Sequence, residues 1–472
     1  MRRVALGLVT LGVLAAGCGS SSHHQPRPPG HHHVQVKAKA NLWVSKSGGA
    51  CTRQTTAGAE IPAQACGSLN AAYAAASCGD VVNIDAGNYK AEQNMIDNPA
   101  LDHCASPVVF QAAPGVARSA VVFSYPGNAI NDYDGCCGGG TKGASNWVLQ
   151  NVTVRGGIQW NTRNVTINNI QGGSLYLSGT GIKVENSNLG PCYNLVTLPA
   201  GEKNNVGYPG PTHSPDPSVE CNQNIKIGAN DVTFKHNVIH DFLDDDSNSY
   251  FDHFECVFIA AGTKITFDSN KFYDCQIYSI FLQDYAGPIS DVTIQNNWFW
   301  ANEGGMGACT ADRQCPPVDA GGIAHDTLTF GATDKGISNV LIRYNSFDPC
   351  CGIAQEGSML GPNIRAVGNI LGGPTAGGCI PGVAFSYNLW QDGGDGGPCG
   401  SGDLTTTSDP FVSSGKSGAI PDDLHLRCGT PAQNLVKPNT PDYQLNVDID
   451  GNPRNPEGPR DAGASAEKSC RT

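Results

Sequence analysis

The chain has 472 residues and a formal net charge of −13, with 29 Lys and Arg against 42 Asp and Glu. Charged residues make up only 15% of it and 59 residues are Gly, the balance of a loop-rich β protein rather than of a disordered chain. The sequence has no basic cluster, which argues against nucleic acid and anionic membrane surfaces as partners and disfavours unassisted binding of highly acidic polysaccharides.

The N-terminus predicts an export signal. Two arginines precede an apolar run from Val4 to Leu14, which is too short to span a bilayer as a mature helix. The following LAAGC phrase ends at Cys18 and resembles the lipobox of bacterial lipoproteins. This resemblance implies that residues 1–17 are removed, that Cys18 is lipid-modified, and that the protein is anchored to the bacterial membrane or cell surface. Residues 18–40, rich in Ser, His and Pro, are expected to form a disordered tether.

Residues 41–144 are predicted to form an N-terminal cap and the first coils of the fold. A strand-like run opens at Leu42. Ser68 is suited to capping a short helix, because the apolar residues that follow it, to Ala76, fall at helical spacing. The segment from Gly79 to Tyr89 then predicts a strand followed by a turn.

One phrase recurs six times between residues 230 and 390: apolar, any, apolar, two residues, Asn, any, apolar. The asparagines are Asn237, Asn270, Asn297, Asn345, Asn369 and Asn388. Alternation before each Asn predicts a short strand with one face inward. The spacings of 33, 27, 48, 24 and 19 residues fit one solenoid coil plus loops of varying size. Stacking the coils places each Asn above the last, so the amides are expected to form an interior hydrogen-bond ladder.

Three upstream segments keep these offsets, with Ser or an apolar residue at the Asn position. They are Trp147–Val152, Val165–Ile170 and Ile182–Leu189. We therefore predict an all-β parallel β-helix with its core at residues 145–400 and a C-terminal cap and tail at residues 401–472. A β-sandwich is the alternative, but its hairpins do not repeat a fixed Asn offset.

The predicted capping helix and the phrase at Gly79–Tyr89 resemble the N-terminal cap of right-handed parallel β-helix proteins of the pectate-lyase-like superfamily. There a helix plugs the open end, which would otherwise expose apolar core and strand edge. The tail from Asp448 to Ala464 is similar to the terminal phrase of many secreted bacterial β-helix proteins. This resemblance implies the fold of nearly the whole mature chain. It implies no single activity, because the superfamily hosts lyases, hydrolases, esterases, epimerases and inert adhesins.

The cysteines favour a disulfide framework. Of 19 Cys, 18 remain if Cys18 is lipidated, enough for nine disulfides in an oxidising compartment. Cys256 and Cys275 lie 19 residues apart, about one coil, which predicts a bridge between neighbouring coils.

Long insertions enter the coil at one point. A second strand precedes each Asn-bearing strand, at Ile225–Ile227, Val257–Ile259, Ile280–Leu282 and Leu328–Phe330. The insertions 190–222, 240–254 and 300–325 all fall before these second strands. Insertions at one point of a solenoid project from one side, where they can form the walls of a groove.

A column of polar residues lies two positions before the second strands. Its members are Gln223, Glu255, Tyr278 and Asp326, with Glu356 placed ahead of an expected strand at Ser358–Leu360. Coils stack roughly 4.8 Å apart, so Glu255 and Asp326 should lie about 10 Å apart and Asp326 about 5 Å from Glu356. Carboxylate pairs at these separations suit glycoside hydrolysis, with one carboxyl as acid and one as base. The alternative is that these residues cap turns beside the insertions.

The second insertion concentrates acidic residues. Asp241, Asp244, Asp245, Asp246 and Asp252 are candidate Ca²⁺ ligands, because Ca²⁺ prefers several oxygen ligands in a flexible loop. A solvated acidic loop is the alternative. His253, two residues before Glu255, could act with it as a base and its orienting partner.

In pectate lyases Ca²⁺ bridges the protein to an acidic sugar and a Lys or Arg removes the proton. The nearest candidates for that base are Lys235 and Arg343. Both share an outward column with Asp268 and Gln295, where surface pairing is the simpler account.

Two outward features suggest contact with glycans. Thr233, Thr266 and Thr293 form a regular row, which β-propensity alone also explains. Trp298 and Trp300, beside the third insertion, are candidates for stacking on sugar rings, with one of the two expected to point into the core.

These features predict a surface-anchored, monomeric carbohydrate-active protein. The leading hypothesis is a hydrolase or lyase of a neutral or weakly acidic polysaccharide, with Ca²⁺ as the one cofactor considered. The alternative is a non-catalytic glycan-binding or adhesin-like module.

Overall fold

The computed structural model describes residues 39–131, 143–194, 224–244, 255–275, 278–300, 327–349, 352–372, 379–391, 397–414 and 423–466. All of them belong to one unit, Ala38–Thr472. The predicted export signal, Cys18 and nearly all of the tether lie outside the described residues. No helix among the described residues is long and apolar enough to cross a membrane.

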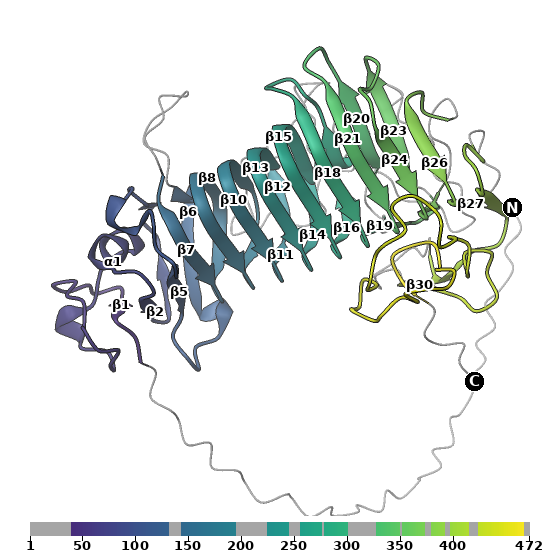
Figure 1. The fold of residues 1–472 in the computed structure, drawn as a ribbon. Helices are drawn as coiled ribbons and strands as arrows, with labels where there is room; N and C mark the ends of the chain where they lie inside the picture. Colours follow the sequence, from purple (N-terminus) through teal and green to yellow (C-terminus); the bar gives the residue numbers. More distant parts are fainter. Residues whose placement is uncertain are drawn as a thin grey trace, which may run out of the picture. The chain divides into compact units, whose positions relative to one another are not determined.

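Parallel strands stack side by side along the chain (Figure 1), and 28 of them join in one sheet. The chain is therefore a parallel β-helix, as predicted. Its described coils present three faces, defined here by their strands.

Face 1 consists of the strands that follow the three insertions and of the strands or half-strands in line with them on the other coils. The first group belongs to β13 (Ile225–Lys235), β15 (Val257–Asp268) and β20 (Thr327–Ala332), and the others belong to β8 (Thr153–Asn168), β10 (Leu175–Glu185), β17 (Tyr278–Leu282) and β23 (Ile353–Gly357).

Face 2 leads into the ladder residues. It contains β2 (Val81–Ile84), β5 (Val108–Ala112), β7 (Ser145–Gln150), the second halves of β8, β10, β13 and β15, β18 (Ile289–Gln295), β21 (Ile337–Arg343), β24 (Ile364–Val367) and β26 (Val383–Ser386).

Face 3 follows the ladder residues. It contains β9 (Gln171–Gly172), β11 (Asn188–Leu189), β14 (Val238–Asp244), β16 (Lys271–Cys275), β19 (Trp298–Trp300), β22 (Ser346–Phe347), β25 (Ile370–Leu371), β27 (Leu389–Gln391) and β28 (Leu404–Thr406). The remaining elements are β1 (Leu42–Val44), α1 (Leu69–Ala75), β3 (Gly87–Tyr89), β4 (Gln93–Asn94), β6 (Val121–Asn131), β12 (Cys192–Asn194), β29 (Phe411–Ser413), β30 (Asp423–Leu426) and the 3-10 turns Pro62–Gln64, Pro99–Leu101 and Arg118–Ala120.

The register confirms the predicted coils. The first apolar residue of every repeated phrase pairs with its equivalent in the next coil: Trp147, Val165, Ile182, Val232, Ile265, Val292, Val340, Ile364 and Val383. All except Val383 are buried. Side chains alternate between the two faces of each strand, so this register places the same inward position above itself in every coil.

The six asparagines form a continuous interior ladder. Each Nδ2 donates at 3.0–3.2 Å to the Oδ1 of the next member, and the run ends on Asp403 rather than on another Asn. Each Nδ2 also donates to a backbone carbonyl of the preceding coil, as Asn297 does to Phe267 at 3.1 Å. Upstream, Ser187 N–H donates to Asn237 Oδ1 at 2.9 Å. The ladder therefore pairs amide groups that are buried at a corner and would be costly to leave unpaired.

Left-handed backbone at the corners explains where the strands turn. The residue before each ladder Asn has positive φ: His236 (55°), Ser269 (59°), Asn296 (56°), Tyr344 (52°), Gly368 (63°) and Tyr387 (54°). Residues other than Gly rarely adopt this conformation, at a cost of roughly 1–2 kcal/mol. The amide hydrogen bonds of the ladder hold each corner in place against this cost.

The N-terminal end is capped by α1, as the sequence predicts. Ser68 Oγ accepts a hydrogen bond from Ala71 N–H at 3.1 Å, and Leu69, Ala72 and Tyr73 are buried against the first coils. This contact covers apolar core that an open solenoid end would expose to water.

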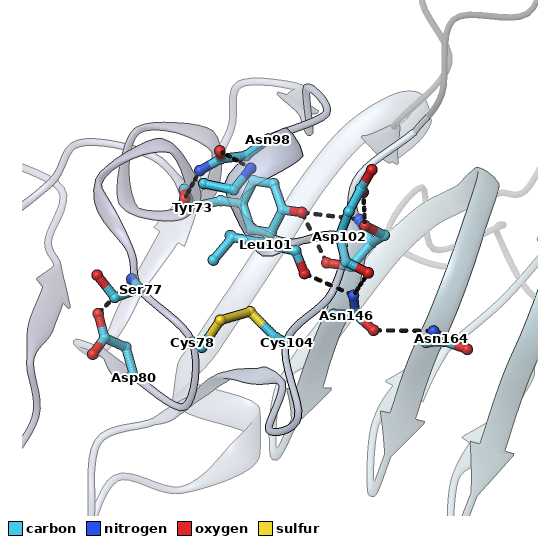
Figure 2. The surroundings of a disulfide bond; sticks show 12 residues. Tyr73, Ser77, Cys78, Asp80, Asn98, Leu101, Asp102, Cys104, Asn146 and Asn164 are labelled. Atoms are coloured by element: carbon cyan, nitrogen blue, oxygen red, sulfur yellow. Dashed lines mark hydrogen bonds between the residues drawn. A yellow bond between two sulfur atoms is a disulfide. The ribbon is translucent and has the colours of Figure 1, made fainter.

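A disulfide and a hydrogen-bond network join the cap to the stack (Figure 2). Cys78 and Cys104 form the disulfide, with a Cα–Cα distance of 5.2 Å. Tyr73 Oη donates to Ser145 O at 2.8 Å and accepts from Ser145 N–H at 2.9 Å. Asn146 Nδ2 donates to the carbonyls of Leu101 and Asp102 at 2.7 Å.

Four disulfides join described cysteines: Cys51–Cys66, Cys78–Cys104, Cys256–Cys275 and Cys379–Cys399. The third is the predicted bridge between neighbouring coils. Such a framework is typical of exported proteins in oxidising compartments.

The C-terminal segment, defined here as residues 411–414 and 423–466, packs on face 3 and on the neighbouring corner. Its apolar residues share a buried cluster with Trp298, Trp300, Tyr344, Ile370 and Leu389. The guanidinium of its fully buried Arg454 donates to Asn296 Oδ1 at 3.0 Å and lies 4.6 Å from the Tyr344 ring centroid. Burial lowers the pKa of Arg454 to about 10, still well above neutral pH, so this buried group carries its charge.

Candidate functional site

The predicted groove side of the molecule is face 1, three of whose strands follow the insertions. The insertion residues themselves lie outside the described residues, apart from short stretches at their ends. Glu255 and Tyr278 lie where β15 and β17 begin. The disulfide Cys256–Cys275 joins two neighbouring coils beside these residues, and Cys256 N–H donates to Tyr278 O at 3.0 Å.

Glu255 is buried at this end of face 1, with 2% of its surface exposed. Asn224 Nδ2, from the coil before, donates to Glu255 Oε2 at 2.8 Å. The carboxylate is therefore held in the stack by the side-chain amide of the preceding coil. Its predicted partner Asp326, and His253, with which it was alternatively expected to form a base and its orienting partner, lie outside the described residues.

Glu356 does not occupy the predicted column. The strand of its coil is β23, Ile353–Gly357, and not the expected Ser358–Leu360. Glu356 consequently pairs with Gly331, near the end of β20, whereas the column lies before the start of each strand. The prediction that Glu356 occupies the same position of its coil as Asp326 is therefore wrong, because Glu356 lies near the end of its strand and not before it.

Tyr278 nevertheless reaches Glu356. The register shifts between Tyr278 and Ile280, as at a β-bulge, and the ring of Tyr278 packs against Phe281 with centroids 4.7 Å apart. Tyr278 Oη donates a hydrogen bond to Glu356 Oε1. Bulges of this kind re-aim side chains and occur next to active sites more often than elsewhere.

Gly331 makes this contact sterically feasible. A Cβ at this position would lie 2.5 Å from Cε2 and Cζ of Phe281, so any side chain would displace that ring. The small residue lets Phe281 cover β20 and lets Tyr278 span two coils to Glu356.

Lys226 lies at the centre of an aromatic cluster on the outer side of face 1. Its Nζ is 5.6 Å from the ring centroids of Tyr176 and Phe258 and 5.3 Å from that of Tyr285, and it donates to Tyr285 Oη at 2.8 Å. Tyr176, Lys226, Phe258 and Phe281 occupy one register position on successive coils. We call Tyr176, Lys226, Phe258 and Tyr285 the lysine–aromatic cluster.

The cluster is accessible at one end and continuous with Tyr278 at the other. Tyr285 is 49% exposed, whereas Phe281 and Tyr278 are buried. Phe258 stacks on both Tyr285 and Phe281 with centroids 5.7 Å away. A band of rings thus runs along face 1 from Lys226 to Glu356, with an ammonium at one end and a carboxylate at the other.

Sequence reasoning missed the lysine–aromatic cluster. The signal was present in the predicted second strands, where Lys226, Phe258 and Phe281 each stand between two inward apolar residues. Two large aromatic side chains and a lysine at outward positions indicate a surface that either binds a ligand or packs against another part of the chain.

A buried carboxylate fixes the turn that presents Tyr285. Asp284 Oδ1 accepts from Thr333 N–H at 2.5 Å, and Oδ2 accepts from Gly336 N–H in the next coil. Burial alone would raise the pKa of Asp284, but these backbone hydrogen bonds lower the pKa below its ordinary value. Asp284 therefore holds this turn as an ionised group at neutral pH.

Most of the predicted Ca²⁺ site lies outside the described residues, including the side chains of Asp244, Asp245, Asp246 and Asp252. The side chain of Asp241 is described: its Oδ2 lies 2.5 Å from His240 Nδ1, while His240 Nε2 lies 2.7 Å from Asn188 Oδ1. Among the described residues no group of three or more acidic, His or Cys side chains is arranged to hold a metal ion.

Trp298 and Trp300 are not exposed, contrary to the stacking prediction. They are 3% and 1% exposed, because the C-terminal segment packs over this part of face 3. Trp300 also stacks on Tyr273, which stacks on His240, each pair with centroids 4.7 Å apart. These ring faces are occupied by protein and are closed to sugars.

On face 2, Thr233, Thr266 and Thr293 do align on successive coils. Lys235 lies 4.0 Å from Asp268, and Arg343 donates to Gln295 Oε1 at 2.8–3.0 Å. The surface pairing expected for Lys235 and Arg343 is confirmed, and both belong to face 2 rather than to face 1.

The fold defines the chain as a parallel β-helix protein. No protein-family model and no curated protein matches it. Pectate lyase Pel9A resembles it with a TM-score of 0.43 and 12% identity, over 92% of this chain and 98% of its own. The PL6 family alginate lyase AlyGC (TM-score 0.28, 11% identity, 70% of this chain and 51% of its own) and a rhamnogalacturonan lyase (0.29, 13%, 75% and 74%) also resemble it. At these identities the likeness concerns the fold alone.

Proposed function

We propose that the protein is a carbohydrate-active β-helix that binds a neutral or weakly acidic polysaccharide along face 1. The observation that carries the proposal is the lysine–aromatic cluster, where Lys226 lies beside three rings and donates to the partly exposed Tyr285. Aromatic rings offer apolar area to sugar faces, and an ammonium donates hydrogen bonds to hydroxyl or carboxylate oxygens.

Charge limits the acidity of the ligand. A protein of net charge −13 repels a densely charged polyanion, and the cluster contributes one cation. Lys226 is suited to an uncharged chain, or to one that carries an occasional carboxylate.

Catalysis is the second candidate, and one observation favours it. The hydrogen bond from Tyr278 to Glu356 places a phenol and a carboxylate together at a register shift on face 1. Hydrolysis there would need a second carboxyl group such as Asp326. Elimination would need a base, for which Lys226 is better placed than Lys235 or Arg343.

Calcium and lipidation complete the proposal. Ca²⁺ bound by Asp241, Asp244, Asp245, Asp246 and Asp252 would lie in the insertion before face 1 and would compensate its negative charge. Lipidation of Cys18 would anchor the protein to the membrane or cell surface, and a monomer is expected.

The test compares Lys226→Met with Lys183→Met, a matched change of an exposed lysine on face 2. Binding to a panel of soluble polysaccharides is measured by calorimetry, with Ca²⁺ and with chelator. We expect Lys226→Met to weaken binding about tenfold, the value of one lost charge-assisted hydrogen bond, and Lys183→Met to leave it unchanged. Equal affinity of the two variants would overturn the proposal.

The same samples separate binding from catalysis. Reducing ends report hydrolysis, and ultraviolet absorbance of unsaturated ends reports elimination. Product release that is lost in Glu356→Gln would establish the catalytic candidate, whereas binding without product leaves the non-catalytic module.

A further inference from the structure

The hairpin formed by β29 and β30 is the part of the C-terminal segment that lies nearest to Trp298. Phe411, Leu424 and Leu426 share the buried cluster of Trp298. His425, on β30, meets the indole edge-on, with centroids 4.9 Å apart. The hairpin thus covers part of the Trp298 side chain on face 3.

His425 bridges two carboxylates on two different elements. Its Nδ1 bonds Asp423 Oδ1 on its own strand, and its Nε2 lies 2.8 Å from Asp450 Oδ2 in the turn 448–452. That turn is anchored by Asp448, which accepts hydrogen bonds from the N–H groups of Asp450 and Asn452 at 3.0 and 2.7 Å. The imidazole therefore ties a hairpin to a fixed turn.

An imidazole can donate to both carboxylates only when it is protonated on both nitrogens. Neutral histidine has one N–H, so one of the two ionised carboxylates would face a lone pair. We propose that His425 is a pH-dependent clasp, which holds the β29–β30 hairpin over Trp298 when it is charged and releases it when it is neutral.

The other charged groups around His425 are few among the described residues. Lys271, on β16, lies 4.2 Å from the centroid of the Trp298 ring. The described residues of β29 carry no titratable side chain. Asp423 and Asp450 therefore dominate the field at the imidazole.

The direction of the titration agrees with this role. Burial lowers the pKa of His425, but the hydrogen bonds that the ring donates to Asp423 and Asp450 outweigh it, so that the pKa is raised above its ordinary value. A raised histidine pKa means that the contribution of the clasp is complete below the ordinary pKa and is lost as pH rises through the folded-state pKa. The clasp is closed below the ordinary histidine pKa and opens as pH rises through the raised pKa of the folded state.

Opening would expose a surface suited to binding a ligand. Trp298 with Lys271 against its ring presents an indole beside a cation, and the indole N–H has no hydrogen-bond partner among the described residues. The device thus couples the pH of the medium to the exposure of an aromatic side chain on face 3. It does not depend on the function proposed for face 1.

Hydrogen–deuterium exchange of the full chain tests the clasp between about pH 6 and pH 9, on either side of the ordinary histidine pKa. After correction for intrinsic rates, we expect the amides of β30 to lose protection about two- to fivefold across this range in the wild type, the effect of losing a partly exposed ion pair. Amides of β21 should not change.

Two clasp variants and one control make the result decisive. His425→Gln and Asp450→Asn should lower β30 protection at the acid end and remove the pH step, while His236→Gln, a change at a corner on another part of the coil, should keep it. A pH step that persists in both clasp variants, or a wild type without a step, would overturn the proposal. Unchanged exchange in β21 shows that each variant is folded.

Discussion

Faces 1 and 3 both carry aromatic side chains in columns, but they have opposite environments. On face 1 the column that contains Phe258 and Phe281 leads to Tyr285, which is 49% exposed in the following turn beside Lys226. On face 3 the column His240, Tyr273 and Trp300 lies next to Trp298, which is 3% exposed. Both columns consist of side chains at outward strand positions. What differs is that the C-terminal segment returns to cover face 3. An outward aromatic side chain is therefore either left exposed to solvent or covered by a distant part of the chain.

The largest effect should follow from truncating the covered face. Trp298→Ala removes a buried indole of β19 that packs against the C-terminal segment, and we expect it to lower the free energy of unfolding by about 3–5 kcal/mol. Chemical denaturation measures this, and polysaccharide binding by the remaining folded protein should be unchanged. A loss of binding without a loss of stability would show that face 3 contacts ligand.

The next effect concerns Arg454, the buried cation that holds the C-terminal segment against the coils. Arg454→Met removes hydrogen bonds to Asn296 and to the carbonyls of Gly463 and Ala464, leaving buried acceptors unpaired. We expect a loss of about 3 kcal/mol in a denaturation experiment. The matched control is Arg427→Met, whose side chain is 49% exposed and should cost under about 1 kcal/mol. Equal losses in the two variants would refute the anchoring role.

The turn that presents Tyr285 should make face 1 sensitive to acid. The lowered pKa of Asp284 means that its contribution is present above the ordinary pKa and is lost as pH falls through the folded-state pKa. Asp284→Asn should cost about 1–3 kcal/mol at neutral pH and flatten the decline of the melting temperature in acid. An unchanged acid profile in the variant would contradict the assignment.

The smallest effect on stability, and the most selective, should come from the exposed end of face 1. Tyr285→Ala is expected to change the free energy of unfolding by less than about 0.5 kcal/mol, as is usual for surface substitutions, while weakening polysaccharide binding. Calorimetry and denaturation on the same preparation check both. A large loss of stability with normal affinity would show that Tyr285 serves packing. The outward aromatic side chains of face 1 would then have the same structural role as those of face 3.

Much of the fold was predictable because its information is local. The strand ending at Asn297 is identified by alternation over a few residues, and its pairing with the strand ending at Asn345 follows from the repeated offset. The interior ladder required no knowledge of the 47 residues between these two asparagines. The bridge between Cys256 and Cys275 followed from the length of a coil.

The errors arose where local rules were broken. Glu356 was predicted to precede the strand of its coil, but it lies within β23, which begins at Ile353, directly after a segment without alternation. The outward turn of Tyr278 depends on a shift in the register between β17 and β20, which the sequence of β17 does not reveal. Trp298 was assigned to the surface because its cover comes from residues more than 100 positions further along the chain.

The sequence by itself determined the coil, the ladder and the N-terminal cap, since each depends on a short pattern that every coil repeats. Only the tertiary structure decided which outward columns meet solvent. Burial of Trp298, exposure of Tyr285 and the contact of Lys226 with three rings all depend on side chains from different coils or from the returning C-terminal segment. Such contacts are set by long-range packing, and no local period encodes them.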